Sequence, residues 1–368
     1  MDLTAPIYFP EWNQVLAAAT ATLKDMQACP QDAKFHAEGD VLTHTGMVLT
    51  AVTQHPEWHS LTQADQELLS LALLLHDCGK PATTKYEDGR ITSKGHSLAG
   101  CQLARILMRQ AGIPLMRREA VIALIRLHGW PPNLLNQACP EMEVIKAAWL
   151  SSNRLLSILA WADMTGRKGE TSNALDAVNL WAATAKEYKC WKQPMTGSND
   201  ESKIIAFDGK DIRHYVPVQK YKGTMTMLSG LPGAGKDTWI RKYLTALPMV
   251  SLDAVREELD VDPTDNQGTV LQTGKEQLRQ QLRTGNDFVF NATNLTRDIR
   301  TPWIQLARDY GYRINIVYLE PPITQVLKQN ASRGSKKVPE YIIHKLVDKL
   351  SPPTPEEAHT INLVSNTI

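Results

Sequence analysis

The chain has little net charge of either sign. Its 40 lysines and arginines stand against 39 aspartates and glutamates, which gives +1 at pH 7. This balance excludes a protein that attracts nucleic acid through an overall basic field, so any such binding must use local patches. The short basic runs at 167–169 and 333–337 are candidates, although runs of this length are usually solvated surface.

Cysteine is also scarce, and long apolar runs are absent. The five cysteines, at positions 29, 78, 101, 139 and 190, form no C-x-x-C pair, which favours free thiols in a reducing cytoplasm. The opening residues, MDLTAPIYFPEWN, are neither basic nor a long apolar run, and no stretch is long enough to span a bilayer. We therefore expect a cytoplasmic protein without a membrane partner.

Apolar periodicity divides the chain into two parts. The stretches 62–77, 97–112, 117–129 and 142–166 repeat apolar residues at i, i+3, i+4 and i+7, which predicts helices, and residues 88–95 fit a short hairpin or a loop over a site. From 224 onward, strand patterns at 224–230, 248–253, 287–293, 313–320 and 360–365 alternate with helical ones. We predict an all-α domain at 1–195, a linker at 196–222, and an α/β domain with a parallel sheet at 223–368.

A glycine-rich loop follows the first of these strands. In TMTMLSGLPGAGKDT (224–238), Gly230 and Gly235 frame four residues and Lys236 comes next, which fits G-x-x-x-x-G-K. Such a loop cradles phosphate with backbone N–H groups, a helix N-terminus and the lysine, so we expect ATP or another NTP with Mg²⁺. The next position normally holds Mg²⁺ through Ser or Thr, but it is Asp237. The expected binding residues are Gly230, Gly233, Ala234, Gly235, Lys236, Asp237 and Thr238.

Two further positions suit phosphoryl transfer. Asp253 follows the second strand, on the side where parallel sheets bind ligands, and Arg256 lies one helical turn on. The carboxylate would accept a proton from an attacking hydroxyl and the arginine would hold an anionic acceptor; alternatively, Asp253 caps a helix. Arg333 lies in a glycine-containing basic loop, which is typical of a lid over the transferring phosphate or of a solvated surface loop.

The helical part carries histidines and carboxylates on several predicted helices. An apolar helical run ends in the adjacent pair His76 and Asp77. This composition is typical of a hydrolytic metal site, and imidazole favours transition metals; the alternative is a set of unrelated core or surface histidines. The candidate ligands are His44, His76, Asp77, His96, His128 and Asp163.

Residues 224–368 resemble the polynucleotide-kinase branch of P-loop phosphotransferases. The resemblance rests on GLPGAGKDT, the D-x-x-R of Asp253 and Arg256, FNATNLTRDIR and the NASR…VP lid. It implies that Asp253 is the general base for a 5′-hydroxyl, that Arg256 contacts a nucleic-acid phosphate, and that Lys236 and Arg333 contact ATP phosphates. The chain departs from the family at Asp237, usually Ser or Thr, and at Asn291, often Asp.

The helical part resembles the HD phosphohydrolase superfamily through HT-x-x-V, HDxGK, GH-x-x-AG and D-x-x-GR, most closely the HD domain of bacterial tRNA nucleotidyltransferases. That module acts on 2′,3′-cyclic phosphate and related 2′-phosphate ends. The resemblance implies that His44, His76, Asp77 and Asp163 bind one divalent ion. It further implies that His96 and His128 serve a second metal or phosphate, and that Lys80 lines the phosphate pocket. We interpret His36, Glu38 and Asp40 as a capped turn rather than as site groups.

The same domain order occurs in the bacterial HD-Pnk end-healing enzymes, and the resemblance covers nearly the whole chain. It implies removal of 2′,3′-cyclic, 2′- or 3′-phosphate by the first domain with Mn²⁺, Ni²⁺, Co²⁺ or Cu²⁺, and 5′-phosphorylation of RNA or DNA ends by the second with ATP and Mg²⁺. Sealing would need a separate ligase. Two alternatives stay open: an HD nucleotidase joined to a small-molecule kinase, and a non-catalytic NTP-sensing switch.

Overall fold

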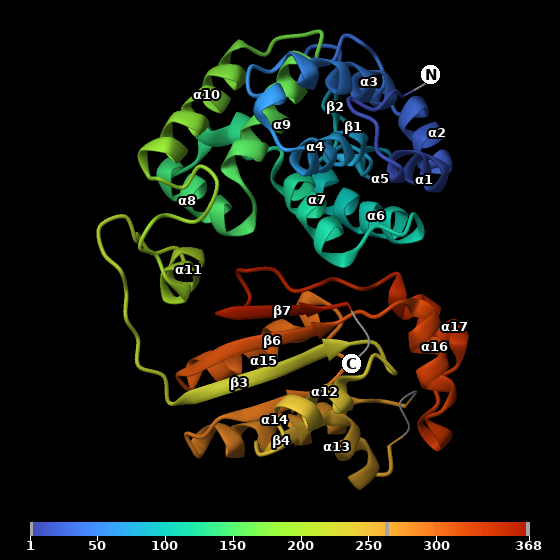
Figure 1. Cartoon of the computed structure of the whole chain (residues 1–368), viewed down its shortest axis with the longest axis vertical. Helices are drawn as coiled ribbons and strands as arrows, with labels where there is room; N and C mark the ends of the chain where they lie inside the picture. Colours follow the sequence, from blue (N-terminus) through green and yellow to red (C-terminus); the bar gives the residue numbers. More distant parts are fainter. Residues whose placement is uncertain (1–2, 262–264, 366–368) are drawn as a thin grey trace. The chain divides into compact units, whose positions relative to one another are not determined.

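The chain folds as two units in the computed structural model, which describes residues 3–261 and 265–365. Contacts cluster within Met1–Ser198 and within Asn199–Ile368 (Figure 1). This confirms the predicted order of a helical part followed by an α/β part. No helix among the described residues is long and apolar enough to cross a membrane.

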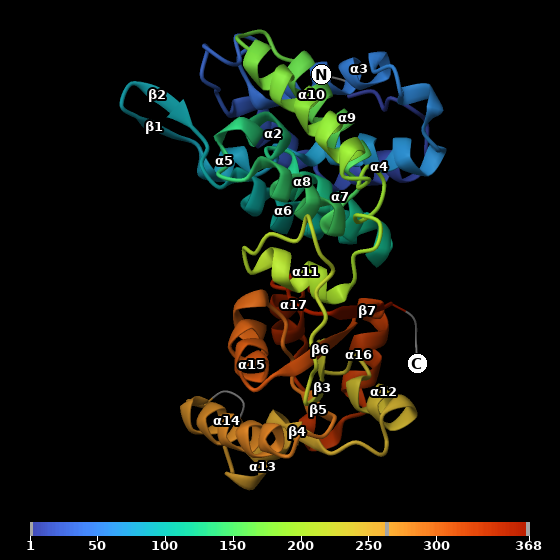
Figure 2. The ribbon, with the colours of Figure 1, turned by 90° about the vertical axis from the view of Figure 1, so that its left-hand side faces the viewer.

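The first unit is built from helices and one small hairpin. Its α-helices are α1 (Glu11–Ala18), α2 (Thr20–Ala28), α3 (Val41–Ala51), α4 (Gln63–Leu75), α5 (Lys80–Thr83), α6 (His96–Gln110), α7 (Leu115–Leu127), α8 (Pro140–Leu150), α9 (Asn153–Thr165) and α10 (Ser172–Glu187). Short 3₁₀ turns are η1 (Val52–Gln54), η2 (Trp58–Ser60) and η3 (Pro131–Asn136). The antiparallel strands β1 (Lys85–Glu87) and β2 (Arg90–Thr92) confirm the expected hairpin, which projects from the helices (Figure 2).

Helix α4 forms the centre of this unit and delivers the His-Asp pair. Every residue from Leu69 to Leu75 is buried, as expected for a helix that is apolar all round. Because α4 ends at Leu75, His76 and Asp77 follow inside the core rather than at the surface. Helices α3 and α9 both contact α4 and contribute further site residues.

One predicted helix is in fact two. The pattern over 142–166 is interrupted at Ser151, whose backbone is extended, and the side chain of Ser152 accepts a hydrogen bond from the Leu155 N–H at the start of α9. Serine is a favoured N-cap residue because its hydroxyl satisfies one of the free N–H groups of a first turn. The cap lets α9 start in a new direction after α8.

The second unit is a five-stranded parallel sheet in the order β4-β5-β3-β6-β7. Its strands are β3 (Gly223–Gly230), β4 (Met249–Ser251), β5 (Phe288–Asn291), β6 (Tyr312–Leu319) and β7 (Thr360–Val364). Its helices are α11 (Asp200–Phe207), α12 (Lys236–Tyr243), α13 (Leu252–Glu258), α14 (Gly268–Arg283), α15 (Arg297–Asp309), α16 (Ile323–Ala331) and α17 (Glu340–Val347), with the turn η4 (Gly334–Lys336). The glycine-rich loop therefore leaves the central strand, β3.

Alternating side chains of the strands form the core of this unit. Met225 and Met227 of β3 lie in one buried cluster with Leu278 of α14 and Trp303 of α15, which cover that face. Figure 2 shows α15 on one side of the sheet and α12 on the other. The carboxyl ends of the strands are thereby left open to ligands, as in other open parallel sheets.

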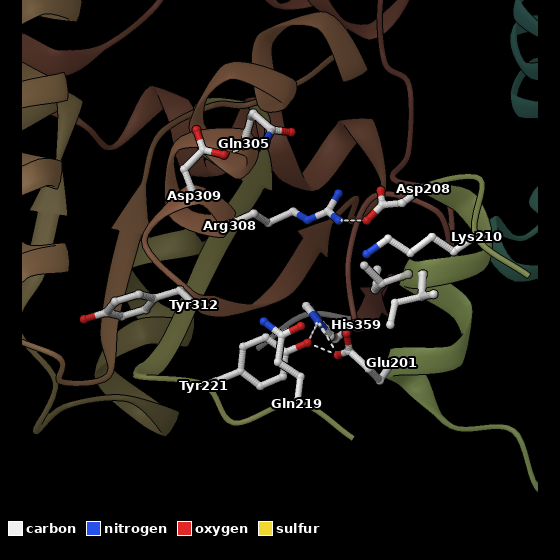
Figure 3. A pocket seen from close by; sticks show the side chains of 12 residues that line it. Glu201, Asp208, Lys210, Gln219, Tyr221, Gln305, Arg308, Asp309, Tyr312 and His359 are labelled. Carbon is white, nitrogen blue, oxygen red and sulfur yellow. Dashed lines mark hydrogen bonds and ion pairs between the residues drawn. The ribbon is translucent and has the colours of Figure 1, made fainter. Parts of the chain in front are cut away.

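The predicted linker at 196–222 is partly wrong, because helix α11 lies within it and belongs to the second unit. Lys203 Nζ donates to the His359 carbonyl at 2.7 Å, and the Tyr221 hydroxyl contacts Glu201 and lies 2.6 Å from His359 Nε2. Glu201, Tyr221 and His359 border a polar cavity of about 360 Å³ beside the start of β6 (Figure 3). Polar composition suggested a linker, but these polar side chains hold α11 to the sheet.

Candidate metal centre and candidate phosphate site

Three histidines of the first unit are oriented by the backbone. His76, His96 and His128 each place Nδ1 within 2.7–2.8 Å of the carbonyl oxygen three residues earlier. A carbonyl can only accept, so Nδ1 carries the proton and Nε2 presents a lone pair, the usual arrangement of metal-binding histidines. His96 Nε2 and His128 Nε2 then face each other at 3.1 Å.

Asp77 lies between two pairs of histidines. Its Oδ2 is 3.2 Å from His76 Nε2 and 3.8 Å from His44 Nε2, while its Oδ1 is 3.4 Å from His96 Nε2 and 4.0 Å from His128 Nε2. Two groups with ligand spacing result, His44-His76-Asp77 and Asp77-His96-His128. The carboxylate of Asp77 is placed to serve both.

Asp163 completes the first of these groups from helix α9. Its Oδ1 lies 2.9 Å from His44 Nε2 and 3.8 Å from His76 Nε2. Arg167 contacts both carboxylate oxygens through Nη2, at 2.8 and 2.7 Å. Burial opposes ionisation of this carboxyl, but the Arg167 charge outweighs it and holds the pKa of Asp163 well below its ordinary value.

Glu38 supports His44 from behind. Glu38 Oε1 lies 3.0 Å from His44 Nδ1 and 2.9 Å from His36 Nδ1, and Oε2 accepts from the Lys168 N–H at 2.9 Å. Burial opposes ionisation of Glu38, yet hydrogen bonds from His44, Lys168 and His36 lower its pKa to about 2. The ionised carboxylate keeps the His44 proton on Nδ1 and leaves Nε2 as a lone pair.

The donor set fits a bound cation. If each ring carries its proton on Nδ1, His44 Nε2 and the Asp163 carboxylate face each other as two acceptors, and so do His96 Nε2 and His128 Nε2. His76 Nε2 is buried without a hydrogen-bond partner among the described residues. Lone pairs that converge in this way repel each other unless a positive charge lies between them, and borderline transition metals prefer such imidazole and carboxylate ligands.

The electrostatics of the cluster favour positive charge beside Asp77. Burial lowers the pKa of His128 to about 4, so this ring is neutral at pH 7. Burial also opposes charging of His76, but Asp77 and Asp163 outweigh it and raise the pKa of His76. The Asp77 carboxyl is opposed by burial as well, yet His76 and Lys80 hold its pKa well below the ordinary value.

A wide pocket opens over the cluster. Its volume is about 890 Å³, and the hairpin residues Ile91 and Lys94 line one wall. Lys80, at the start of α5, lies in this wall with Nζ 2.7 Å from Asp77 Oδ2 and 2.7 Å from Gln31 Oε1. Arg167 lines the pocket too. Two cations thus flank the candidate metal ligands, as an anionic substrate requires.

The glycine-rich loop of the second unit has the geometry of a phosphate cradle. Gly233 and Gly235 have φ of 82° and 90°, which side chains disfavour, and a Cβ on Gly230 would lie 2.6 Å from the Leu319 carbonyl oxygen. Lys236 begins α12 and donates to the Gly230 and Leu231 carbonyls at 2.9 and 3.0 Å. The lysine is therefore held against the loop whose N–H groups would bind a phosphate.

The charges of the predicted catalytic groups affect the pKa of one lysine, Lys236. Burial lowers the pKa of Lys236 to about 8, against the opposing charges of Asp253 and Asp237, and the Arg333 charge lowers it further. Asp253 and Arg333 lie far apart in the sequence. Both nevertheless affect the charge of Lys236, as Asp237 does, so the fold brings the four residues into one region. Ala234 is buried within the loop, and Thr238 is exposed on α12.

Asp253 is not the cap of helix α13. Ser251 takes that place, with its hydroxyl accepting from the Ala254 N–H at 3.4 Å. Asp253 instead pairs with Arg256 one turn on, and Arg256 Nε donates to Gln267 Oε1 at 2.8 Å. The side chain of Asp253 stays 51% exposed, so an acceptor can reach it.

Arg333 lies in a loop whose base is fixed. Asn330, fully buried at the end of α16, donates to the Val338 carbonyl at 2.7 Å and accepts from the Val338 N–H at 3.0 Å. A Cβ on Gly233 would lie 3.0 Å from the Val326 carbonyl oxygen, so α16 packs directly against the glycine-rich loop. The loop that carries Arg333 is thus closed at both ends beside the phosphate cradle.

Comparison with known families agrees with the two domains. Residues 41–148 match the HD domain, and residues 225–353 match an AAA domain of the P-loop class. The chain joins an HD domain to a P-loop kinase-like domain. A kinase-like domain implies ATP and a divalent metal, and HD domains bind metals.

Relatives resemble the kinase-like domain. An L-seryl-tRNA(Sec) kinase from Methanococcus maripaludis is 21% identical over 136 residues, which is 35% of this chain and 53% of that protein. The chain thus spans about half the length of this curated relative. A sugar kinase from a Janibacter species is 17% identical with a TM-score of 0.32, over 39% of this chain and 85% of that one. A gluconokinase from Sinorhizobium meliloti is 15% identical with a TM-score of 0.29, over 40% and 86%.

Sequence reasoning missed three groups of the HD domain. His36 and Glu38 were expected in a capped turn, but only Asp40 caps a helix, accepting from Thr43 N at 2.8 Å, while the other two contact His44 and each other. Arg167 was quoted only as the end of D-x-x-GR and as part of the basic run at 167–169, without a role of its own, yet it contacts Asp163. Its position four residues after Asp163 is the one signal that pointed to this contact.

Proposed function

We propose that this protein repairs broken RNA or DNA ends in the cytoplasm. The HD domain removes 2′,3′-cyclic phosphate or a 2′- or 3′-phosphate by metal-assisted hydrolysis. The kinase-like domain transfers the γ-phosphate of ATP to a 5′-hydroxyl. The product has the ends that a separate ligase seals.

The observation that carries this proposal is the position of Arg256 beside Asp253. An acceptor with only neutral groups next to its hydroxyl gives this guanidinium nothing to bind. At a 5′-hydroxyl end the first phosphodiester lies close to the reacting oxygen and supplies that anion. A charge-assisted contact to the phosphodiester would draw Arg256 from Asp253 and free the carboxylate to accept a proton.

The kinase reaction then uses three groups of this domain. The acceptor oxygen forms a bond to the γ-phosphorus, the bond from that phosphorus to the ADP oxygen breaks, and the hydroxyl proton passes to Asp253. Lys236 neutralises the β and γ oxygens, and Arg333 stabilises charge on the transferring group. Mg²⁺ bound with the nucleotide would neutralise negative charge on the phosphates.

In the HD domain, Lys80 and Arg167 bind and orient the phosphate above the cluster. A divalent ion held by His44, His76, Asp77 and Asp163 would polarise a phosphoryl oxygen and lower the pKa of bound water. His96 and His128, with Asp77, would hold a second ion or the phosphate itself. The cavity of about 890 Å³ is large enough for a nucleotide with part of the next residue.

The curated relative gives further support. By its name, the Methanococcus maripaludis protein phosphorylates an acceptor carried on a tRNA. An RNA-borne hydroxyl is therefore a reasonable acceptor for a related domain, although that protein matches only the kinase-like part of this chain.

The test compares acceptors that differ only in the first phosphodiester. A 5′-hydroxyl oligonucleotide with a neutral methylphosphonate at that linkage should lose about 10- to 100-fold in kcat/KM, the value of one charge-assisted hydrogen bond. Arg256→Ala should lose as much on the normal oligonucleotide and little more on the methylphosphonate. Equal rates with nucleosides and oligonucleotides would favour the small-molecule kinase. ATP binding without transfer to any acceptor would favour the NTP sensor.

A further inference from the structure

The kinase-like domain departs from the usual magnesium site at two positions that the fold brings together. Asp237 follows the P-loop lysine, and Asn291 ends strand β5, beside Leu228 of the P-loop strand. Asn291 Nδ2 donates to Asp237 Oδ1 at 2.8 Å, across 54 residues of sequence. The two departures are therefore in direct contact.

P-loop enzymes hold Mg²⁺ with a hydroxyl after the lysine and a carboxylate on a neighbouring strand. Here the carboxylate stands after the lysine and the neutral group stands on the strand. The pair carries one negative charge in either arrangement. Each arrangement also offers oxygen atoms from both positions, and oxygen is the ligand that Mg²⁺ prefers.

The environment of Asn291 points to a missing cation. Its side chain is 5% exposed, and the neighbouring carboxylate fixes Nδ2 toward Asp237, so Oδ1 points away from it. That Oδ1 is buried without a hydrogen-bond partner among the described residues. A buried acceptor without a partner costs about 1–3 kcal/mol, which a bound cation would recover. Asp237 is exposed, so an ion with its nucleotide can reach the pair.

We propose that Asp237 and Asn291 form a magnesium site with exchanged roles, in which the P-loop supplies the carboxylate and β5 supplies the neutral oxygen. The inference deepens the proposed function but depends only on its use of Mg²⁺ with a nucleotide, not on the acceptor. The inference also means that Asp237 supports kinase turnover and does not abolish it. A simpler role for Asp237 is stabilisation of the α12 N-terminus by its negative charge.

The test is a double-mutant cycle read by metal binding. Asp237→Ser, Asn291→Asp and the double variant are compared with wild type for Mn²⁺ affinity in the presence of ADP, followed by electron paramagnetic resonance. Asp237→Ser removes the one carboxylate and should weaken binding about tenfold or more, whereas Asn291→Asp adds a second carboxylate and should not weaken it. The double variant restores the usual arrangement and should bind Mn²⁺ within about threefold of wild type.

Two controls distinguish an exchanged magnesium site from damage to the loop or the sheet. Asn315→Asp, an equivalent change on β6, should leave Mn²⁺ affinity unchanged, and ADP binding in EDTA reports an intact loop in each variant. Asp237→Ser with unchanged or tighter Mn²⁺ binding, or a double variant that binds Mn²⁺ no more tightly than Asp237→Ser, would overturn the exchange. The Mn²⁺ binding measurements contain no acceptor. If they give the expected affinities but the protein does not phosphorylate RNA, only the proposed function is refuted.

Discussion

Replacing Glu38 with glutamine should weaken metal binding by the HD domain about 10- to 100-fold without altering a candidate ligand, as changes behind metal-bound histidines commonly do. Three N–H groups converge on this carboxylate: His36 Nδ1 at 2.9 Å, His44 Nδ1 at 3.0 Å and the Lys168 N–H at 2.9 Å. Glutamine offers one oxygen and one NH₂ group. Whichever way the amide turns, its NH₂ faces at least one of these donors.

The magnitude follows from the bonds exchanged. A hydrogen bond to a charged group contributes about 1.5–3 kcal/mol, and one between neutral groups about 0.5–1.5 kcal/mol. Loss of the charge therefore costs about 1–1.5 kcal/mol at His44, and one unpaired donor adds about 1–3 kcal/mol. The lost charge at His44 weakens the binding of metal by His44 Nε2. The unpaired donor weakens metal binding in part and lowers the stability of the domain in part.

Calorimetric titration with Mn²⁺ or Co²⁺ measures the affinity, and thermal unfolding measures the stability. Glu170→Gln is the matched control, because Glu170 also lines the pocket but is 63% exposed and 3.6 Å from Lys34. Such an exposed pair contributes about 0–1 kcal/mol, so the control should bind metal normally. A folded Glu38→Gln protein with wild-type metal affinity would show that His44 is not a ligand held by Glu38.

Four other predictions concern the two sites. Lys236→Ala should abolish 5′-phosphorylation and leave phosphoesterase activity intact in assays of both ends, and loss of both in a folded protein would refute separate sites. Asp253→Asn should lower kinase turnover about 10²–10⁴-fold with ATP binding retained by calorimetry; near-normal turnover would exclude a general base. Asp77→Ala should lower the bound metal measured by elemental analysis and eliminate phosphoesterase activity. The phosphoesterase activity of the wild-type protein should be higher with Mn²⁺, Ni²⁺, Co²⁺ or Cu²⁺ than with Mg²⁺. Activity with Mg²⁺ alone would contradict histidine ligation. Burial lowers the pKa of Lys236 to about 8, and bound ATP phosphates should raise it. Above pH 8, ATP binding should therefore take up a proton, and the affinity for ATP should fall by up to about tenfold per pH unit. An ATP affinity that does not change with pH would contradict this prediction.

Sequence patterns predicted the strands as short apolar runs, since β3 and β5 are buried on both faces, and most helices as one apolar face. Periodicity failed at Ser151, since α8 and α9 are both amphipathic and the apolar spacing continues across the break. It failed again at α11, where Glu201 and Lys203 are buried through particular partners, Tyr221 and the His359 carbonyl, that lie far away in sequence. Composition reports such residues as solvent-facing because burial of a charge depends on the partner, not on the residue type.

The candidate sites show the same division. Motifs with fixed spacing predicted Lys236 and the His76-Asp77 pair, since each of these groups belongs to a short continuous segment. Glu38 and Arg167 could be assigned only once α3 and α9 were placed beside them. The departure at Asp237 was visible in the sequence, but its contact with Asn291 depends on the pairing of β3 with β5.

The central claim is that one chain corrects both ends of a broken strand. The most direct measurement incubates the full-length protein with ATP, Mg²⁺, Mn²⁺ and an RNA that carries a 5′-hydroxyl and a 2′,3′-cyclic phosphate, and then analyses both ends by mass spectrometry. The account predicts a 5′-phosphate and a hydroxyl-terminated 3′ end on the same molecules. An RNA that stays unchanged at both ends, while mononucleotides are hydrolysed or small metabolites phosphorylated, would contradict it.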